Sequence, residues 1–204
     1  MDPTLLRAAR RATGFMPDKE GMALYHAALA VAHLGPLLEV GGYCGKSAIY
    51  LGAAAKEARS VLFSVDHHRG SEENQPGQEH HDRRLVDPNG RVDTFPRFRA
   101  TVAGAGLEEV VVAIVGESAT VAKHWRTTLA MVFIDGGHSQ AAVDADYAGW
   151  TPRLVTGGTL AIHDVFPEPA DGGRPPFVVY ARALQSGDFE EIGTEGSLRV
   201  LRRT

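Results

Sequence analysis

Five acidic or glycine residues follow short apolar runs along this chain of 204 residues. They are Glu39, Asp66, Gly116, Asp135 and Asp164. Carboxylates in such places accept hydrogen bonds from hydroxyl groups or hold a cation, and glycine lets the backbone turn close to a ligand. The carboxyl ends of parallel strands form one edge of a sheet, where ligands bind. We therefore expect these five positions to converge.

A glycine-bearing turn follows the first of these acids, in the segment Glu39-Val40-Gly41-Gly42-Tyr43-Cys44-Gly45. Its spacing, G-G-x-x-G, departs from the G-x-G-x-x-G of dinucleotide-binding proteins, which disfavours an NAD-dependent oxidoreductase. Asp66 lies 21 positions after Gly45 and ends the next apolar run. At a strand end its carboxylate can accept hydrogen bonds from two ribose hydroxyls. Taken one at a time, these residues allow a simpler interpretation. The glycines could serve only to make a tight turn, and Asp66 could be a solvated capping group.

His138 lies three positions after Asp135, where a helix is expected to begin. An imidazole with an ordinary pKa near 6.5 can remove a proton from a hydroxyl group at neutral pH, so His138 is the first candidate for a general base. A histidine at a helix start can also make only a local backbone hydrogen bond.

Asp135 and Asp164 end neighbouring candidate strands and form a candidate pair of ligands for a divalent cation. His163 directly precedes Asp164. An imidazole there would suit Mn or Zn better than Mg, although successive residues of a strand face opposite sides, so His163 could equally point away. We expect Asp135 and Asp164 as ligands, His163 as a third, Mg as the default ion and Mn as the alternative.

The elements that position these residues alternate in type. Apolar runs predict strands over 36–40, 61–65, 110–115, 131–134 and 159–162, with a turn at Gly157-Gly158, and helical patterns cover 18–34 and 45–58. Alternating runs near 189–192 and 198–201 predict a hairpin. This order is typical of an α/β chain with a Rossmann-like, doubly wound, mostly parallel sheet and a C-terminal antiparallel hairpin. We expect one domain over 1–204, with a helical segment over 1–34.

Residues 67–90 interrupt this rhythm with a long polar stretch that contains His67, His68, His80 and His81. Adjacent histidines without cysteines lack a standard zinc spacing. A polar lid over a hydroxylated acceptor is the preferred interpretation of this insertion, and a solvated mobile loop is the plain alternative. On the predicted helix after His138, Asp144 and Asp146 are expected to be solvated or paired with basic neighbours, or Asp146 to brace the site from behind.

Taken together, the segments E-V-G-G-x-x-G, V-D, V-G-E-S, F-I-D-G-G-H and G-G-x-x-x-x-H-D resemble class I S-adenosylmethionine-dependent methyltransferases over roughly residues 35–166. Within that superfamily the chain looks most similar to small bacterial metal-dependent O-methyltransferases, which include macrolide-sugar enzymes and cephalosporin-pathway proteins. The resemblance implies magnesium-holding aspartates and a homodimer. It also implies that residues 14–16, with Glu20 and Gly21, close over the cofactor. The cofactor-binding residues that it implies, together with the glycine turn, are Glu39 and Gly41 beside the methionine part, Gly45, Asp66 at the ribose, and Gly116, Glu117 and Ser118 at the adenine.

Methyl transfer to a hydroxyl of a sugar, of an oligosaccharide such as a methylmannose polysaccharide precursor, or of a glycosylated metabolite is the expected activity. The polar insertion and an aromatic content of 7% favour such a small-molecule or oligosaccharide acceptor over a flat phenol. A catechol-type or other natural-product O-methyltransferase and a non-catalytic cofactor-binding module remain alternatives. The net charge of -4 argues against nucleic acid and anionic membranes as partners. One cysteine, no leader-like segment and no apolar run of about 20 residues predict a cytoplasmic protein without a membrane span.

Overall fold

The computed structural model describes residues 1–78, 80–137, 139–168 and 170–204. Its strands are β1 (Leu37–Val40), β2 (Leu62–Asp66), β3 (Val111–Val115), β4 (Leu129–Ile134), β5 (Leu154–Ile162), β6 (Phe189–Glu195) and β7 (Leu198–Arg203). Its α-helices are α1 (Pro3–Arg11), α2 (Asp18–Val31), α3 (Lys46–Glu57), α4 (Phe95–Gly104), α5 (Ser118–His124), α6 (Gln140–Trp150) and α7 (Pro175–Ser186). The expected alternation of strands and helices is confirmed.

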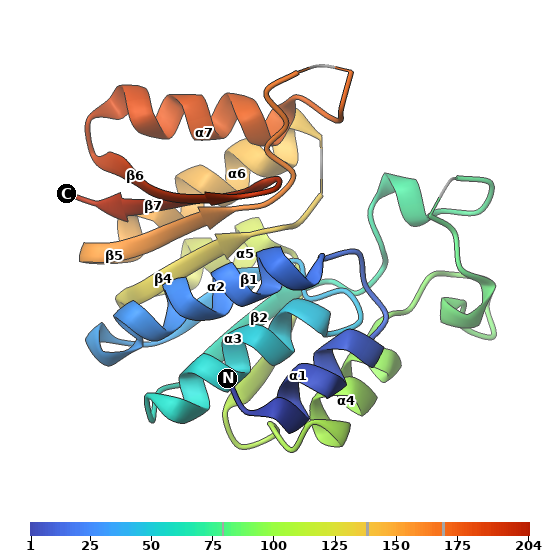
Figure 1. The fold of residues 1–204 in the computed structure, drawn as a ribbon. Coiled ribbons are helices and arrows are strands. Elements are labelled where there is room, and N and C mark those ends of the chain that lie inside the picture. Colours follow the sequence, from blue (N-terminus) through green and yellow to red (C-terminus); the bar gives the residue numbers. More distant parts are fainter. Residues whose placement is uncertain (79, 138, 169) are drawn as a thin grey trace.

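The seven strands form one sheet in the order β3-β2-β1-β4-β5-β7-β6. The first five are parallel, and β7 runs antiparallel to both β5 and β6. All residues of β1 and β4 are buried, as expected for central strands that are covered on both faces. The predicted doubly wound sheet with a C-terminal hairpin is therefore confirmed (Figure 1).

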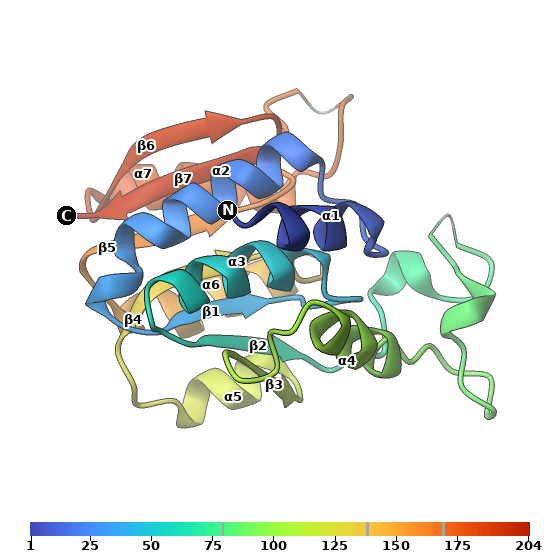
Figure 2. The same cartoon turned by 60° about the horizontal axis from the view of Figure 1, so that its bottom comes forward.

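Helices cover the sheet on two sides (Figures 1 and 2). α1, α2, α3 and α4 share one buried apolar cluster, whereas α5, α6 and α7 belong to the other. In the register of the sheet, Val40 lies beside both Val65 and Ile134. Asp66 and Asp135 therefore leave the sheet at the same edge, one on each side of the turn that follows β1.

The predicted start of β5 was wrong. The strand begins at Leu154, and Gly157 and Gly158 lie within it rather than in a turn before it. The pairing register between β4 and β5 shifts beside Leu129 and Met131, and Gly157 has a φ of +79°. Glycine inside a strand commonly marks such a bulge, so this pair bends β5 without ending it.

The polar insertion projects away from the sheet (Figure 1). Its described part contains two short 3₁₀ turns, Glu72–Asn74 and Arg83–Leu85, and a bridge between Val86 and Val92. Arg69 ties its two ends together, because its guanidinium lies 3.3 Å from Asp87 and donates to the carbonyl oxygen of Val92. Among the described helices, none combines the length and the apolar character needed to cross a membrane.

Candidate active site

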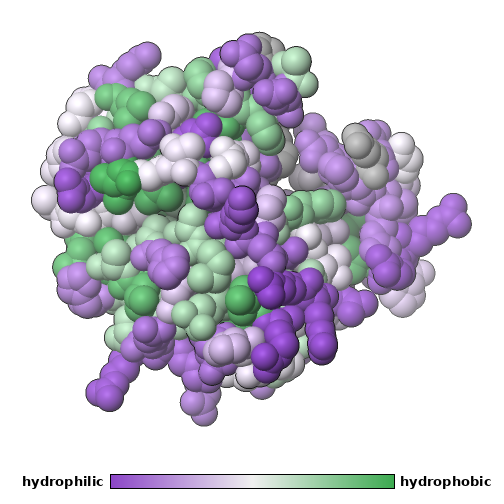
Figure 3. Space-filling model, viewed as in Figure 1, coloured by the Kyte–Doolittle hydropathy of each residue, from purple (hydrophilic) through white to green (hydrophobic). Residues whose placement is uncertain are grey.

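One cavity of about 580 Å³ lies at the carboxyl ends of the parallel strands. Asp66, Gly116, Asp135 and Asp164 all line it, which brings together four of the five positions expected to converge. The surface is hollowed where the insertion meets the body of the molecule, and the visible face of the insertion is mostly hydrophilic (Figure 3). The segment 13–16 also lines the cavity. The fifth position, Glu39, does not reach it.

Asp66 organises the turns on both sides of its own strand. Its Oδ2 accepts a hydrogen bond from the main-chain N–H of Tyr43 at 2.8 Å, and its Oδ1 accepts one from His68 at 2.7 Å. Both donor residues have left-handed backbones, with φ of +43° and +57°. The carboxylate thus holds two strained turns in place and also lies on the cavity wall, so the capping interpretation is confirmed and ligand binding by Asp66 stays a prediction.

The glycine turn after β1 is packed against the turn after β4. Gly41 has a φ of +94°, and a Cβ built there would lie 2.1 Å from the carbonyl oxygen of Asp135. Gly45, with a φ of +90°, directly precedes α3. Gly41 is therefore required by the contact between two main chains, in addition to any contact with a ligand.

Glu39 lies behind the cavity wall. Its side chain is fully buried, and its Oε2 accepts a hydrogen bond from the Ser47 hydroxyl at 2.9 Å. The Ser64 hydroxyl also acts on this carboxyl group as a hydrogen-bond donor. Burial raises the pKa of Glu39 to about 7, with smaller contributions from the negative charges of Asp135 and Asp66. This carboxyl group supports the glycine turn from below.

The turn after β3 forms another part of the wall, through Gly116, Glu117 and Ser118. The main-chain N–H of Gly116 donates to the carbonyl oxygen of Asp66 at 3.1 Å, so this turn adjoins the end of β2. The Ser118 hydroxyl accepts a hydrogen bond from the indole N–H of Trp150 at 2.8 Å. The three residues that the resemblance associates with adenine therefore lie next to Asp66, the residue expected to bind the ribose.

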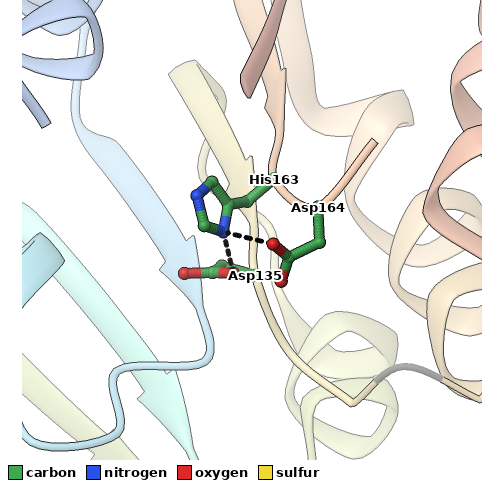
Figure 4. Close-up of side chains that lie close together, drawn as sticks. All are labelled: Asp135, His163 and Asp164. Atoms are coloured by element: carbon green, nitrogen blue, oxygen red, sulfur yellow. Dashed lines mark hydrogen bonds and ion pairs between the residues drawn. The ribbon is translucent and has the colours of Figure 1, made fainter. Parts of the chain in front are cut away.

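Asp135, His163 and Asp164 converge at the ends of β4 and β5 (Figure 4). The Nδ1 atom of His163 lies 3.0 Å from Oδ1 of Asp135 and 3.4 Å from Oδ1 of Asp164. One ligand atom from each of the three residues can be chosen so that all lie within 4.8 Å of one another. Asp164 has a left-handed backbone, with a φ of +55°, after the strand has ended. The alternation of a strand therefore no longer applies, and His163 and Asp164 turn toward the same point.

Glu20, on α2, was expected from the resemblance to belong to the segment that closes over the cofactor, but its side chain contacts His163 and Ser197 instead. Its Oε2 accepts a hydrogen bond from Nε2 of His163 at 2.6 Å, and its Oε1 accepts one from the main-chain N–H of Ser197 at 2.9 Å. A Cβ on Gly196 would lie 2.0 Å from Glu20 Oε1. The only local signal was an acid on the buried face of a helix, since its partner is 143 positions away.

The electrostatics of this cluster favour a positive charge between the carboxylates. Burial alone would lower the pKa of His163, but the negative charge of Asp135 and hydrogen bonds to Asp135, Asp164 and Glu20 outweigh it and raise the pKa to about 12. Burial alone would raise the pKa of Glu20, but hydrogen bonds from His163 and Ser197 lower it. In the absence of another cation, a proton on Nδ1 supplies the positive charge that the two aspartates require.

The histidines of the insertion do not form a metal site in the part of the chain that the structure describes, where the cluster around His163 is the one group with suitable geometry. His68 Nδ1 instead bonds to the Thr94 hydroxyl at 2.7 Å, and His81 Nδ1 to the carbonyl oxygen of Asn74 at 3.0 Å. The ring of His80 packs against Phe15. The predicted base His138 and the insertion residue Glu79 lie outside the described residues.

The two aspartates of α6 differ in their burial and in their partners. Asp144 forms an ion pair with Arg182 at 2.9 Å, as expected for a surface acid. Asp146 is only 5% exposed, is hydrogen-bonded to Ser118 and lines the cavity. For Asp146 the expectation of a solvated or ion-paired group was therefore wrong, because α6 turns this residue toward the sheet, opposite to Asp144. Its contact with Ser118 agrees instead with the alternative, a residue that braces the site.

A family model described as "Methyltransferase domain" matches residues 38–165. Three solved structures share the fold. The O-methyltransferase TomG from Streptomyces achromogenes, involved in tomaymycin synthesis and solved with S-adenosylmethionine, is 16% identical, with a TM-score of 0.66 over 100% of this chain and 91% of its own. The O-methyltransferase NovP is 16% identical, with a TM-score of 0.71 over 92% of this chain and 80% of its own. The calicheamicin methyltransferase CalS11 is 15% identical, with a TM-score of 0.63 over 99% and 93%. The chain belongs to the methyltransferase-domain family.

Proposed function

We propose that this protein transfers a methyl group from S-adenosylmethionine to a hydroxyl oxygen of a sugar, an oligosaccharide or a glycosylated metabolite, assisted by a divalent cation. The single observation that carries the proposal is the placement of the Asp66 turn and the Asp135 cluster in one cavity. A methyl donor and an acceptor have to meet within one site, so both sets of groups must be accessible from the same space.

The cofactor half of the cavity fits a nucleoside joined to an amino acid. Asp66, already fixed by two main-chain N–H groups, can accept hydrogen bonds from ribose hydroxyls. Glu39 lies buried below the glycine turn, and in its ionised form it would contribute negative charge there. A sulfonium and an ammonium group carry positive charge, which a nearby carboxylate favours. Bound S-adenosylmethionine would supply the electrophilic methyl group.

The other half of the cavity fits a divalent cation. Asp135, His163 and Asp164 would hold it, and Glu20 on the far nitrogen of His163 completes the carboxylate and imidazole arrangement common at metal sites. Two carboxylates with one imidazole suit Mn²⁺ or Mg²⁺, and the nitrogen ligand favours Mn²⁺. Such a cation would lower the pKa of the acceptor hydroxyl. We propose His138 as the group that would receive the hydroxyl proton while the oxygen forms its bond to the methyl carbon and the bond from that carbon to the sulfonium sulfur breaks, with S-adenosylhomocysteine as the leaving group.

The proposed acceptor region combines polar and apolar walls. Glu73, Asn74 and His80 of the insertion line the cavity, together with Phe15 and Phe166. Carboxylate, amide and imidazole groups can bind several hydroxyls, while aromatic faces pack against the C–H faces of a sugar ring. We propose that the insertion serves as the lid over this acceptor. A phenolic acceptor in the same cavity is the second candidate, favoured by the two phenylalanines.

The test is transfer of a radiolabelled methyl group from S-adenosylmethionine to panels of sugar and catechol acceptors, with Mg²⁺, with Mn²⁺ or after chelation. Label on a sugar hydroxyl that requires the metal supports the full proposal. Label on catechols alone selects the second candidate, and undiminished transfer after chelation contradicts the metal. No transfer to any acceptor, with intact cofactor binding, would favour a binding module without catalysis.

A further inference from the structure

The cavity contains a buried acid that the proposed reaction does not use. Asp146 of α6 is 5% exposed and lines the cavity, yet it has no Lys or Arg partner among the described residues. A buried carboxyl group without a cation is costly unless a hydrogen-bond donor satisfies it. Its hydrogen bond to Ser118 accounts for only part of the acceptor capacity of its two oxygens.

The surroundings of Asp146 define what could bind there. The Ser118 oxygen accepts the Trp150 indole N–H at 2.8 Å, which leaves the serine hydroxyl hydrogen free to point at the carboxyl group. On the other side, a Cβ placed on Gly136 would lie 3.2 Å from Asp146 Oδ2. The carboxyl group is therefore fixed between the turn after β3 and the turn after β4.

This end of the cavity is a slot with small walls. Besides the turn at Gly116, it is lined by Ala119, Ala142 and Ala145. Small side chains leave room for a flat ring, and the slot adjoins Asp66 through the hydrogen bond from the Gly116 N–H to the Asp66 carbonyl oxygen. A base attached to a ribose held by Asp66 would enter this slot, so this step rests on the proposed function.

We propose that Asp146 is a specificity-determining residue of the cofactor site, which accepts a hydrogen bond from the exocyclic amine of a 6-aminopurine and thereby rejects 6-oxopurines. The carboxylate is an acceptor only, so it attracts an amine N–H and repels a carbonyl oxygen at the same place. Burial raises the pKa of Asp146 to about 6, and at pH 8 the group is ionised.

The experiment compares the binding of S-adenosylhomocysteine and of its 6-oxo analogue, S-inosylhomocysteine, by calorimetry at pH 8. The unmodified protein should prefer the adenosyl compound by about 10- to 100-fold, the range expected for a hydrogen bond to a charged group. In Asp146→Asn the ratio should fall to within about threefold, because an amide can donate to a carbonyl as well as accept from an amine. Asp146→Ala serves as a second variant, with the same expectation.

Asp144→Asn is the matched control, since Asp144 lies on the same helix but pairs with Arg182 outside the cavity. Its preference should equal that of the unmodified protein. Equal binding of the two compounds by the unmodified protein, or an unchanged preference in folded Asp146→Asn, overturns the inference while leaving the proposed function intact. Failure of S-adenosylhomocysteine to bind the unmodified protein overturns both.

Discussion

The two halves of the cavity rim are held by different means. On the side of β1 and β2, Asp66 is fixed by the main-chain N–H groups of Tyr43 and His68, within 23 positions of it. On the side of β4 and β5, Asp135 is fixed by His163, which is held in turn by Glu20 from the other end of the chain. The first half is a property of local turns, whereas the second exists only when α2, β5 and the hairpin are assembled.

Because of this difference, we expect the two halves of the cavity rim to have different functions. Main-chain N–H donors orient the Asp66 carboxylate without the help of any other side chain, which suits a fixed contact to a cofactor. The network around His163 is built of charged side chains, whose balance depends on the cation that lies between the aspartates. We therefore expect changes on the first side to alter cofactor binding, and changes on the second to alter turnover and folding.

The largest effect is expected for Asp135→Asn, which removes one negative charge from the proposed reacting centre. Turnover should fall by at least about 1000-fold, because charge that stabilises the transition state is lost. The affinity for S-adenosylhomocysteine should stay within about threefold of that of the unmodified protein, since the Asp135 carboxylate lies on the acceptor side of the cavity. Initial rates and calorimetry provide the two readouts. A parallel fall of affinity would remove the distinction between the halves.

Glu20→Gln should destabilise the protein by about 3 kcal/mol, because breaking a buried charge pair leaves an unpaired charge. A glutamine has one acceptor oxygen and cannot serve both His163 Nε2 and the Ser197 N–H, which now bond to different oxygens. Urea unfolding measures this change. The control is Glu57→Gln, whose exposed carboxylate binds Tyr25 at 2.5 Å and should cost no more than about 1 kcal/mol. Similar losses in the two variants would contradict a special role for Glu20.

The residues just named show what the sequence could predict. The positions of Asp66 and Gly41 in turns and the alternation of strands and helices follow from local spacing and apolar runs, because each of these features depends on a few neighbouring residues. The contact of Glu20 with His163 could not be predicted, since its partners His163 and Ser197 meet it only in the assembled fold. For Asp146 the sequence left two interpretations open, because a helix period alone does not show which face meets the sheet when the helix is only weakly amphipathic.

Asp66→Ala should weaken binding of S-adenosylhomocysteine by roughly 30- to 100-fold, the loss expected for hydrogen bonds to a charged group. Turnover at saturating cofactor should change by less than about fivefold, because the contact is the same in the ground and transition states. Calorimetry and saturation kinetics separate the two quantities. If turnover at saturation collapsed while affinity held, the two halves would have been assigned in reverse.

A smaller effect concerns the pH dependence of stability without cofactor or metal. The folded-state pKa of Glu39 is raised to about 7, above its ordinary value of 4.5. Its contribution is therefore fully present below pH 4.5 and is lost as the pH rises through 7. Glu39→Gln, which keeps the neutral form, should exceed the unmodified protein in stability by about 2 kcal/mol above pH 7. Unfolding curves from pH 4 to 8 check this. A difference that does not vary with pH would contradict the assigned pKa.

The most direct test of the account is a calorimetric titration of metal-stripped protein with S-adenosylhomocysteine, repeated after Mn²⁺ or Mg²⁺ is restored. We predict saturable binding in each case, with an affinity that the metal changes by less than about threefold, because the cofactor contacts lie on the Asp66 side. Absence of binding under every condition would contradict the assignment of this cavity to S-adenosylmethionine.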